Sequence, residues 1–302
     1  MVKRSRRKNK RKGTRRNRRH RGGGNCLFVS FPPDSGLGNL MFVYAAAIVV
    51  RDKIRSQMCL LPYTNKHSDK DYRTILFKQG KSVEKDSRVD GAKRLLGNLT
   101  LESTESHTRW NYTASPENST GDTIMGDAYF QNYDCIIPAI STIRKDCVDI
   151  FANMYPGFKD TIKPTSAFMH IRKGDYKDLL SLNNDYYNRA LAMLDTANGI
   201  TDIYILSDDI AWCKQQEWKS AKIQWFDEPD ELKSMYLMSL CLGGACISAS
   251  TFSTWGAILG ADQNESSTIV YPSSWITGRP SSELQFPSRW KQITGIQNVF
   301  SK

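Results

Sequence analysis

An apolar run that ends in a cluster of charges is the feature of this sequence with the clearest chemical meaning. Residues 166–176 read SAFMHIRKGDY, so His170, Arg172 and Lys173 stand at the end of the run. A short continuous apolar run is typical of a buried parallel strand, and Gly174 permits a sharp exit from it. Ligands bind outside the carboxyl ends of such strands, and a guanidinium beside an ammonium suits a diphosphate. The alternative is a surface loop with a chance group of charges.

Two further apolar segments also end in polar side chains. Residues 202–206 (DIYIL) precede Asp208 and Asp209, and residues 245–248 (ACIS) precede residues 249–253 (ASTFS). Either aspartate is placed to accept hydrogen bonds from N–H groups of a purine edge or from ribose hydroxyls. Either could instead serve only as the N-cap of the next helix.

The hydroxyls of Ser250, Thr251 and Ser253 stand where a helix is expected to begin. Together with the free amides of the first turn they would form a second cradle for an anion. Ser250 could also be a helix cap and nothing more. We therefore expect an edge of the sheet that binds a nucleotide sugar and is built from His170, Arg172, Lys173 and these hydroxyls.

Helical patterns separate the apolar segments. Residues 184–197 and 230–242 carry apolar side chains at helical spacing, and residues 268–271 (TIVY) form a fourth apolar run. Alternation of strands and helices predicts an α/β fold with a parallel sheet, whose strand ends share one edge.

The start of the chain beyond residue 25 follows the same plan. Residues 26–31 read as a strand, residues 40–53 as a helix, and Gly36, Gly38 and Asn39 form the turn between them. Such a turn is commonly a plain connection. Across a cleft between two domains it could instead face the ligand from the opposite side.

Four segments resemble one enzyme family in order and spacing. His170 to Tyr176 (HIRKGDY) resembles the H-x-R-R-G-D-Y motif of the galactoside 2-α-L-fucosyltransferases, which are α-1,2-fucosyltransferases of glycosyltransferase family 11. Residues 36–42 (GLGNLMF) resemble that family's G-x-L-G-N-Q-M-F, and residues 129–131 (YFQ) its G-Y-F-Q. Residues 237–256 resemble its block ending in N-S-T-F-S-W-W-G.

The resemblance implies a GT-B fold of two Rossmann-like domains with the donor in the cleft between them. We expect an N-terminal half over residues 25–164, with a polar insertion near 80–122, and a GDP-fucose-binding half over residues 165–302. The implied reaction is an inverting, metal-independent transfer of L-fucose from GDP-β-L-fucose to the 2-hydroxyl of a terminal galactose on a glycan. GDP-fucose is the donor substrate, and no cofactor or metal is implied.

In this reaction Arg172 would stabilise the departing diphosphate as a catalytic residue. Asp175 is the nearest candidate for the general base, although its position in the turn suits an orienting partner of Arg172 better. The chain departs from the family pattern at Lys173, Leu40 and Thr254. A catalytically silent, glycan-binding relative is therefore a second hypothesis.

The first residues have a composition of their own. Of the 42 Lys and Arg residues in the chain, 13 lie in residues 1–21, which leaves 29 basic against 31 acidic residues in the remainder. Residues 1–24 should be a disordered basic arm, because so charged a segment cannot bury a core. Binding of nucleic acid or of an anionic membrane through this arm is the third hypothesis.

Animal enzymes of this family carry a signal anchor and face the Golgi lumen, so the resemblance implies a Golgi location and a glycoprotein. The longest apolar run, residues 40–50, is too short to span a membrane. An anchor would thus be missing from this sequence, or the arm would provide membrane association. Glycosylation sequons begin at four asparagines. They are Asn98, Asn111, Asn118 and Asn264.

Cysteines and acidic pairs give weaker signals. The chain has seven cysteines, for which Cys135 with Cys147 and Cys241 with Cys246 are candidate pairs. Asp69-Lys70-Asp71 has the form of the D-x-D motif of metal-dependent glycosyltransferases, but no apolar strand precedes it. We expect an exposed loop there and no metal site.

Overall fold

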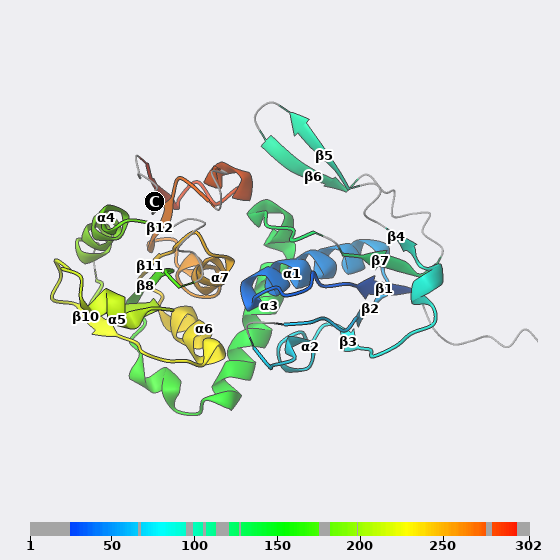
Figure 1. Cartoon of the computed structure of the whole chain (residues 1–302), viewed down its shortest axis with the longest axis horizontal. Helices are drawn as coiled ribbons and strands as arrows, with labels where there is room; N and C mark the ends of the chain where they lie inside the picture. Colours follow the sequence, from blue (N-terminus) through cyan, green and yellow to red (C-terminus); the bar gives the residue numbers. More distant parts are fainter. Residues whose placement is uncertain are drawn as a thin grey trace, which may run out of the picture.

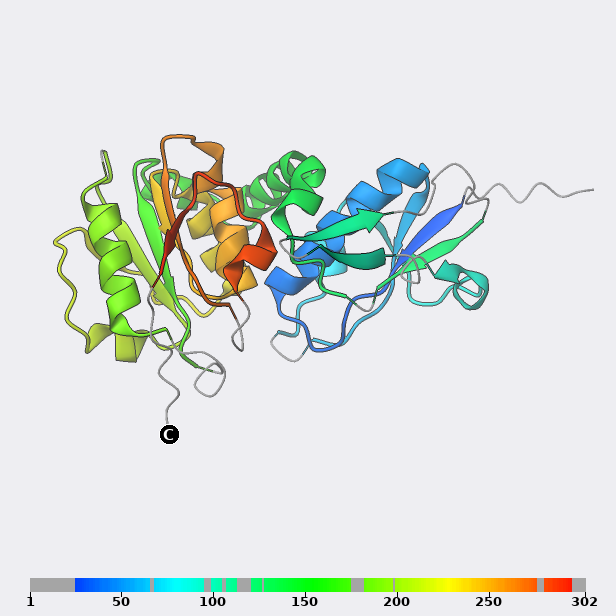
Figure 2. The ribbon, with the colours of Figure 1, turned by 90° about the horizontal axis from the view of Figure 1, so that it is seen from above.

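The computed structural model describes residues 25–65, 68–94, 99–104, 107–112, 121–126, 128–174, 182–197, 199–275 and 280–294. Its two parallel sheets lie at opposite ends of the molecule, with helices between them (Figures 1 and 2). The basic arm lies outside the described residues. No helix within those residues has the length and apolar character needed to cross a bilayer.

The N-terminal half contains a five-stranded sheet in the order β3-β2-β1-β7-β4. Helix α1 (Leu37–Ile54) connects its first two strands, and the short α2 (Tyr72–Ile75) precedes the third. A separate antiparallel hairpin, β5 (Leu99–Thr104) and β6 (His107–Tyr112), stands away from the sheet (Figure 1). The strands of the sheet are β1 (Cys26–Val29), β2 (Gln57–Leu60), β3 (Lys81–Ser82), β4 (Lys93–Arg94) and β7 (Thr123–Met125).

The C-terminal half contains a six-stranded sheet in the order β10-β9-β8-β11-β12-β13, and the long helix α3 (Tyr133–Met154) precedes it. Its strands are β8 (Ala167–Ile171), β9 (Ile203–Ser207), β10 (Ile223–Trp225), β11 (Gly244–Cys246), β12 (Thr268–Pro272) and β13 (Lys291–Ile293). Its helices are α4 (Asn184–Asp195), α5 (Ile210–Lys214), α6 (Glu231–Leu240) and α7 (Thr251–Leu259).

The architecture confirms the fold class predicted from the sequence. Strands β8, β9, β11 and β12 occupy the four predicted apolar segments, and every strand pair described within the two sheets is parallel. Two facing domains of this kind form a GT-B fold. The carboxyl ends of β8 and β9 therefore lie at one edge of the sheet, as the predicted binding edge requires.

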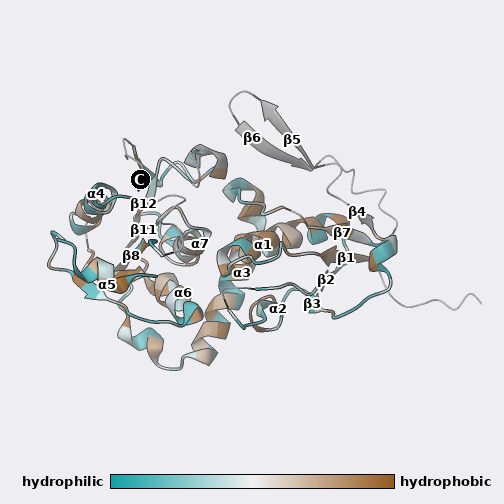
Figure 3. Cartoon of the chain, viewed as in Figure 1, coloured by the Kyte–Doolittle hydropathy of each residue, from teal (hydrophilic) through white to brown (hydrophobic). Residues whose placement is uncertain are grey.

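Helix α1 is the main element of the contact between the halves. It is apolar along most of its length (Figure 3). It is also buried on nearly all sides, because it packs between its own sheet and helices α3 and α7. The Phe42 and Trp255 rings meet edge to face with centroids 5.3 Å apart, so side chains of both halves belong to one core.

The first turn of α1 approaches the first turn of α7 very closely. A Cβ atom on Gly38 would lie 2.4 Å from the backbone nitrogen of Phe252 and 2.4 Å from the carbonyl carbon of Thr251. Next to it, Asn39 Oδ1 accepts hydrogen bonds from Thr251 Oγ1 and Gln131 Nε2, each at 2.9 Å. The glycine-rich turn thus fixes the relative position of the halves.

A disulfide joins Cys26 to Cys59, on neighbouring strands β1 and β2. The two pairings suggested by the sequence are wrong. Cys135 and Cys147 both lie on α3, where twelve residues separate them by roughly 18 Å along the axis, far beyond disulfide reach. Cys241 and Cys246 are buried on either side of the connection from α6 to β11 and are not joined.

We expect Gly38→Ala to destabilise the protein by about 1–3 kcal/mol, because backbone atoms of α7 would have to move to make room. Urea unfolding measures the change. Gly91→Ala is the matched control, since a Cβ atom there has no neighbour within 4 Å and the backbone is not left-handed. Equal stability of the two variants would contradict the close approach.

Candidate functional site

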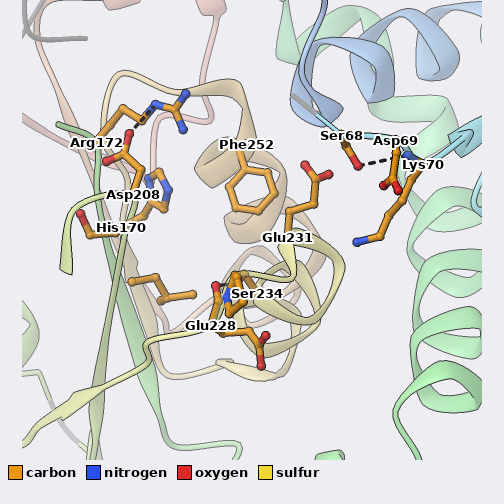
Figure 4. A pocket seen from close by; sticks show the side chains of 13 residues that line it. Ser68, Asp69, Lys70, His170, Arg172, Asp208, Glu228, Glu231, Ser234 and Phe252 are labelled. Carbon is orange, nitrogen blue, oxygen red and sulfur yellow. Dashed lines mark hydrogen bonds and ion pairs between the residues drawn. The ribbon is translucent and has the colours of Figure 1, made fainter. Parts of the chain in front are cut away.

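A cavity of about 650 Å³ opens between the halves at the carboxyl edge of the C-terminal sheet (Figure 4). The C-terminal half supplies the ends of β8 and β9, the segment before α6 and the start of α7. The N-terminal half supplies residues 68–70. The lining residues are Ser68, Asp69, Lys70, His170, Arg172, Leu206, Ser207, Asp208, Glu228, Pro229, Glu231, Ser234 and Phe252.

Asp208 fixes the charged end of β8. Arg172 Nε lies 3.2 Å from Asp208 Oδ2, and both side chains are about three-quarters buried, with exposed fractions of 25% and 24%. The same carboxylate accepts the backbone N–H of Lys173 at 2.8 Å and that of Gly174 at 3.0 Å. A Cβ atom on Gly174 would lie 2.8 Å from Asp208 Oδ2, so glycine permits this contact. Arg172 is thereby held at the cavity wall (Figure 4).

His170 lines the cavity but carries no charge at neutral pH. Its side chain is buried, and Nδ1 lies 2.8 Å from Ser248 Oγ. Burial, together with the nearby charge of Arg172, lowers the pKa of His170 to about 3. The imidazole therefore acts as a neutral hydrogen-bonding group beside the guanidinium.

The side chain of Lys173 lies outside the cavity lining. Its Nζ donates to the carbonyl oxygen of Leu182 at 3.1 Å and lies 4.1 Å from the centroid of the Trp212 ring. Burial lowers the pKa of the ammonium, and its place between these groups is outside the cavity lining. This side chain thus joins β8 to the region of α4 and α5, while Arg172 faces the cavity.

The remaining candidates at strand ends have local structural partners. Asp209 caps α5 by accepting the Trp212 N–H at 3.0 Å. Ser253 is fully buried and donates to the Ser250 carbonyl oxygen at 3.0 Å, while Ser250 makes no side-chain cap. Of residues 250–253, all of them described, Phe252 is the one that lines the cavity.

Residues 68–70, together with Tyr72 and the start of α6, form a part of the site that the sequence did not reveal. Lys70 Nζ lies 2.7 Å from Asp230 Oδ1, and Tyr155 donates to Asp230 Oδ2 at 2.6 Å. The Tyr72 hydroxyl donates to Glu231. The contacts of Lys70 and Tyr72 join residues about 160 positions apart, and that of Tyr155 joins residues 75 apart, so no short sequence motif could indicate them.

The two carboxylates of the D-x-D sequence have different surroundings. Asp71 caps α2 and pairs with Arg73 at 2.8 Å, which lowers the pKa of this carboxyl. Asp69 lies on an exposed loop, as expected, but lines the cavity. Within the described residues, no group of three or more His, Cys, Asp or Glu side chains could hold a metal ion.

The remaining candidates are Asp175 and the four asparagines of the glycosylation sequons. Asp175, Asn98 and Asn118 lie outside the described residues, and Asn111 lies on β6, whose side chains are not described. The side-chain nitrogen of Asn264, the atom that would carry a glycan, donates to the Leu242 carbonyl oxygen at 3.2 Å.

Two facing parallel-sheet domains with a cavity between them have the GT-B architecture. The sequence profile described as Glycosyl transferase family 11 matches residues 129–293, and the chain belongs to this family. The chain is 27% identical over 167 residues to the O-antigen biosynthesis glycosyltransferase WbnK of Escherichia coli. That match covers 51% of this chain and 54% of WbnK, so the chain spans about half the length of this relative.

Solved structures give distant likenesses. Fucosyltransferase NodZ from Bradyrhizobium has a TM-score of 0.49 at 11% identity, over 78% of this chain and 92% of that chain. A mutant of Arabidopsis thaliana FUT1 in complex with GDP has a TM-score of 0.45 at 12% identity, over 89% and 72%. Likenesses at this level carry no argument about the substrate.

The buried neutral His170 predicts a specific loss of stability in acid. Its pKa is about 3 in the folded protein and near 6.5 in an unfolded chain, so between these values the unfolded state binds one proton more. Stability should therefore fall with falling pH by up to about 1.4 kcal/mol per unit, or about 2 kcal/mol at pH 5.

Urea unfolding of wild type and His170→Gln at several pH values measures this dependence. The other titrating groups are common to both proteins, so the difference between the two curves isolates His170. Parallel curves between pH 6.5 and 4.5 would show that His170 is protonated in the folded protein.

Proposed function

We propose that this family 11 glycosyltransferase is an inverting, metal-independent α-1,2-fucosyltransferase. It transfers L-fucose from GDP-β-L-fucose to the 2-hydroxyl of a terminal galactose on a glycan. The observation that carries the proposal is Arg172, held by Asp208 at the carboxyl end of β8 in the cavity between the halves. A guanidinium fixed at such a strand end is suited to the diphosphate of a nucleotide sugar.

The guanidinium acts on the leaving group. As the bond from the anomeric carbon to the diphosphate breaks, negative charge grows on the departing GDP, and a positioned cation stabilises it. His170 adds a neutral hydrogen-bonding group at the same wall. Because Asp208 is already a partner of Arg172 and two amides, its carboxylate serves to orient the cation and not to bind the nucleoside.

The nucleoside is then expected along the lining toward α6. Glu231 and Ser234 line that part of the cavity, beyond the end of β9. A guanine base presents several N–H donors on one edge, and carboxylate and hydroxyl oxygens are the acceptors that match them. This role replaces the one that the sequence suggested for Asp208 and Asp209.

The different partners of Asp69 and Asp71 support a transfer reaction that needs no metal ion. Since Asp71 is engaged by Arg73, it is not placed to share an ion with Asp69. In this proposal Arg172 and hydrogen-bond donors of the cavity compensate the diphosphate charge that a divalent ion would otherwise compensate.

This chain has Lys173 where the family has an arginine. Because Lys173 lies outside the cavity lining, this difference favours neither a catalytically silent relative nor a weaker site for the nucleotide sugar. WbnK is named for O-antigen biosynthesis, which is in keeping with a glycan acceptor here. Galactose as the acceptor, a Golgi location and membrane association stay predictions from the family resemblance. The nucleic-acid hypothesis depends on the basic arm, which lies outside the described residues.

Arg172→Ala should lower kcat/KM for GDP-fucose by at least about 10²–10³, the usual cost of removing a donor that stabilises developing negative charge. Steady-state kinetics with a β-galactoside acceptor measures the change. Lys173→Ala is the control: it should cost stability through the lost contacts with Leu182 and Trp212, but less than tenfold in kcat/KM. If folded Arg172→Ala keeps more than a tenth of the wild-type kcat/KM, the diphosphate site is elsewhere.

Saturating EDTA should leave the transfer rate within about twofold, and added manganese should not raise the rate of a metal-stripped sample, since protein cations compensate the leaving group. The same kinetic assay gives the measurement. A strict requirement for manganese would contradict the metal-independent mechanism and direct attention to Asp69 as a ligand.

A further inference from the structure

An inverting transfer needs a base as well as a stabilised leaving group. The acceptor hydroxyl is a weak nucleophile, and a positioned carboxylate makes its attack faster by removing the proton. Among the described residues, four carboxylates line the cavity: Asp69, Asp208, Glu228 and Glu231. The partners of these side chains distinguish them.

Three of the four already have partners. Asp208 holds Arg172 and two backbone amides. Glu228 pairs with Lys233 at 2.7 Å, and its other oxygen accepts the Asp230 N–H at 3.1 Å. Glu231 accepts a hydrogen bond from the Tyr72 hydroxyl and so joins the two halves.

Asp69 differs from the other three. Its side chain is exposed to the cavity and has no hydrogen bond or ion pair within the described part of the chain. The backbone beside it is nevertheless held: the Lys70 N–H donates to Ser68 Oγ at 3.2 Å, and Lys70 Nζ pairs with Asp230 at 2.7 Å. Asp69 is thus an available carboxylate on an anchored loop, as a general base must be.

The position of Asp69 also fits the stereochemistry of inversion. Arg172 and Asp208 lie at one side of the cavity and residues 68–70 at the other, with Phe252 and Glu231 between them in this view (Figure 4). An inverting displacement brings the nucleophile to the face of the sugar opposite the leaving group. A base on the N-terminal half faces a leaving group held by the C-terminal half.

We propose that Asp69 is the catalytic base that activates the acceptor hydroxyl. The inference rests on the proposed function. The Asp69 carboxylate takes the proton from the acceptor hydroxyl while that oxygen bonds to the anomeric carbon of fucose. The bond from this carbon to the diphosphate oxygen breaks, its electron pair leaves with GDP, and Asp69 later releases the proton to water.

The test uses Asp69→Asn, which keeps the size of the side chain and removes its ability to take a proton. We expect transfer to a β-galactoside to fall by about 10²–10⁴-fold. Binding of GDP-fucose, measured by calorimetry, should change less than twofold. Asp71→Asn is the matched control from the same loop: asparagine still caps α2, so transfer should stay within about threefold of wild type.

A second measurement separates a base from a merely structural residue. Azide attacks without losing a proton, so it should speed the release of GDP from GDP-fucose by Asp69→Ala and yield fucosyl azide. The proposal is overturned if azide has no effect on Asp69→Ala, or if folded Asp69→Asn keeps more than a tenth of wild-type transfer.

The outcomes also distinguish this inference from the proposed function. If the wild-type protein does not bind or consume GDP-fucose, both proposals fail. If the wild type and Asp69→Asn transfer fucose at similar rates, the fucosyltransferase stands and the assignment of its base is wrong.

Discussion

The site depends on the contact between the first turns of α1 and α7. Asn39 Oδ1 accepts from Gln131 and from Thr251, so three segments far apart in the sequence meet at one oxygen atom. Gly38 brings the backbones together beside that atom, and Phe252 on the far side packs its ring 5.6 Å from the ring of His170. Because the cavity is lined from both halves, a shift at this contact would change its width.

A second set of contacts joins the two halves beside the cavity. Lys70 and Tyr72 reach from the N-terminal half to Asp230 and Glu231 at the start of α6. Burial of Tyr72, with the charge of Glu231 nearby, raises the pKa of its hydroxyl, which keeps it a donor. These groups line or border the cavity and at the same time join the halves, so binding and domain packing are physically connected here.

Much of the fold could be predicted, and the limits of prediction have identifiable causes. The apolar segments gave the C-terminal strands, and their charged ends placed Arg172 at the correct edge. His170 and Arg172 line the cavity and Lys173 does not, in keeping with the alternation of side chains along a strand. Asp69 and Glu231 line one cavity because distant segments meet there, and no local sequence pattern indicates such a meeting.

The hydroxyls of Ser250, Thr251 and Ser253 at the start of α7 show that residues of a specific motif can serve packing without lining the cavity. Thr251 donates a hydrogen bond to Asn39, and Ser253 is buried and donates to the Ser250 carbonyl oxygen, so these side chains hold the start of α7 in place next to Phe252 of the cavity lining. A reaction between two bound sugars loses rate steeply when their separation changes by about 1 Å. The C-terminal half supplies Arg172 to the cavity, and the N-terminal half supplies Asp69. The packing motifs are therefore as necessary to the chemistry as the charged ones.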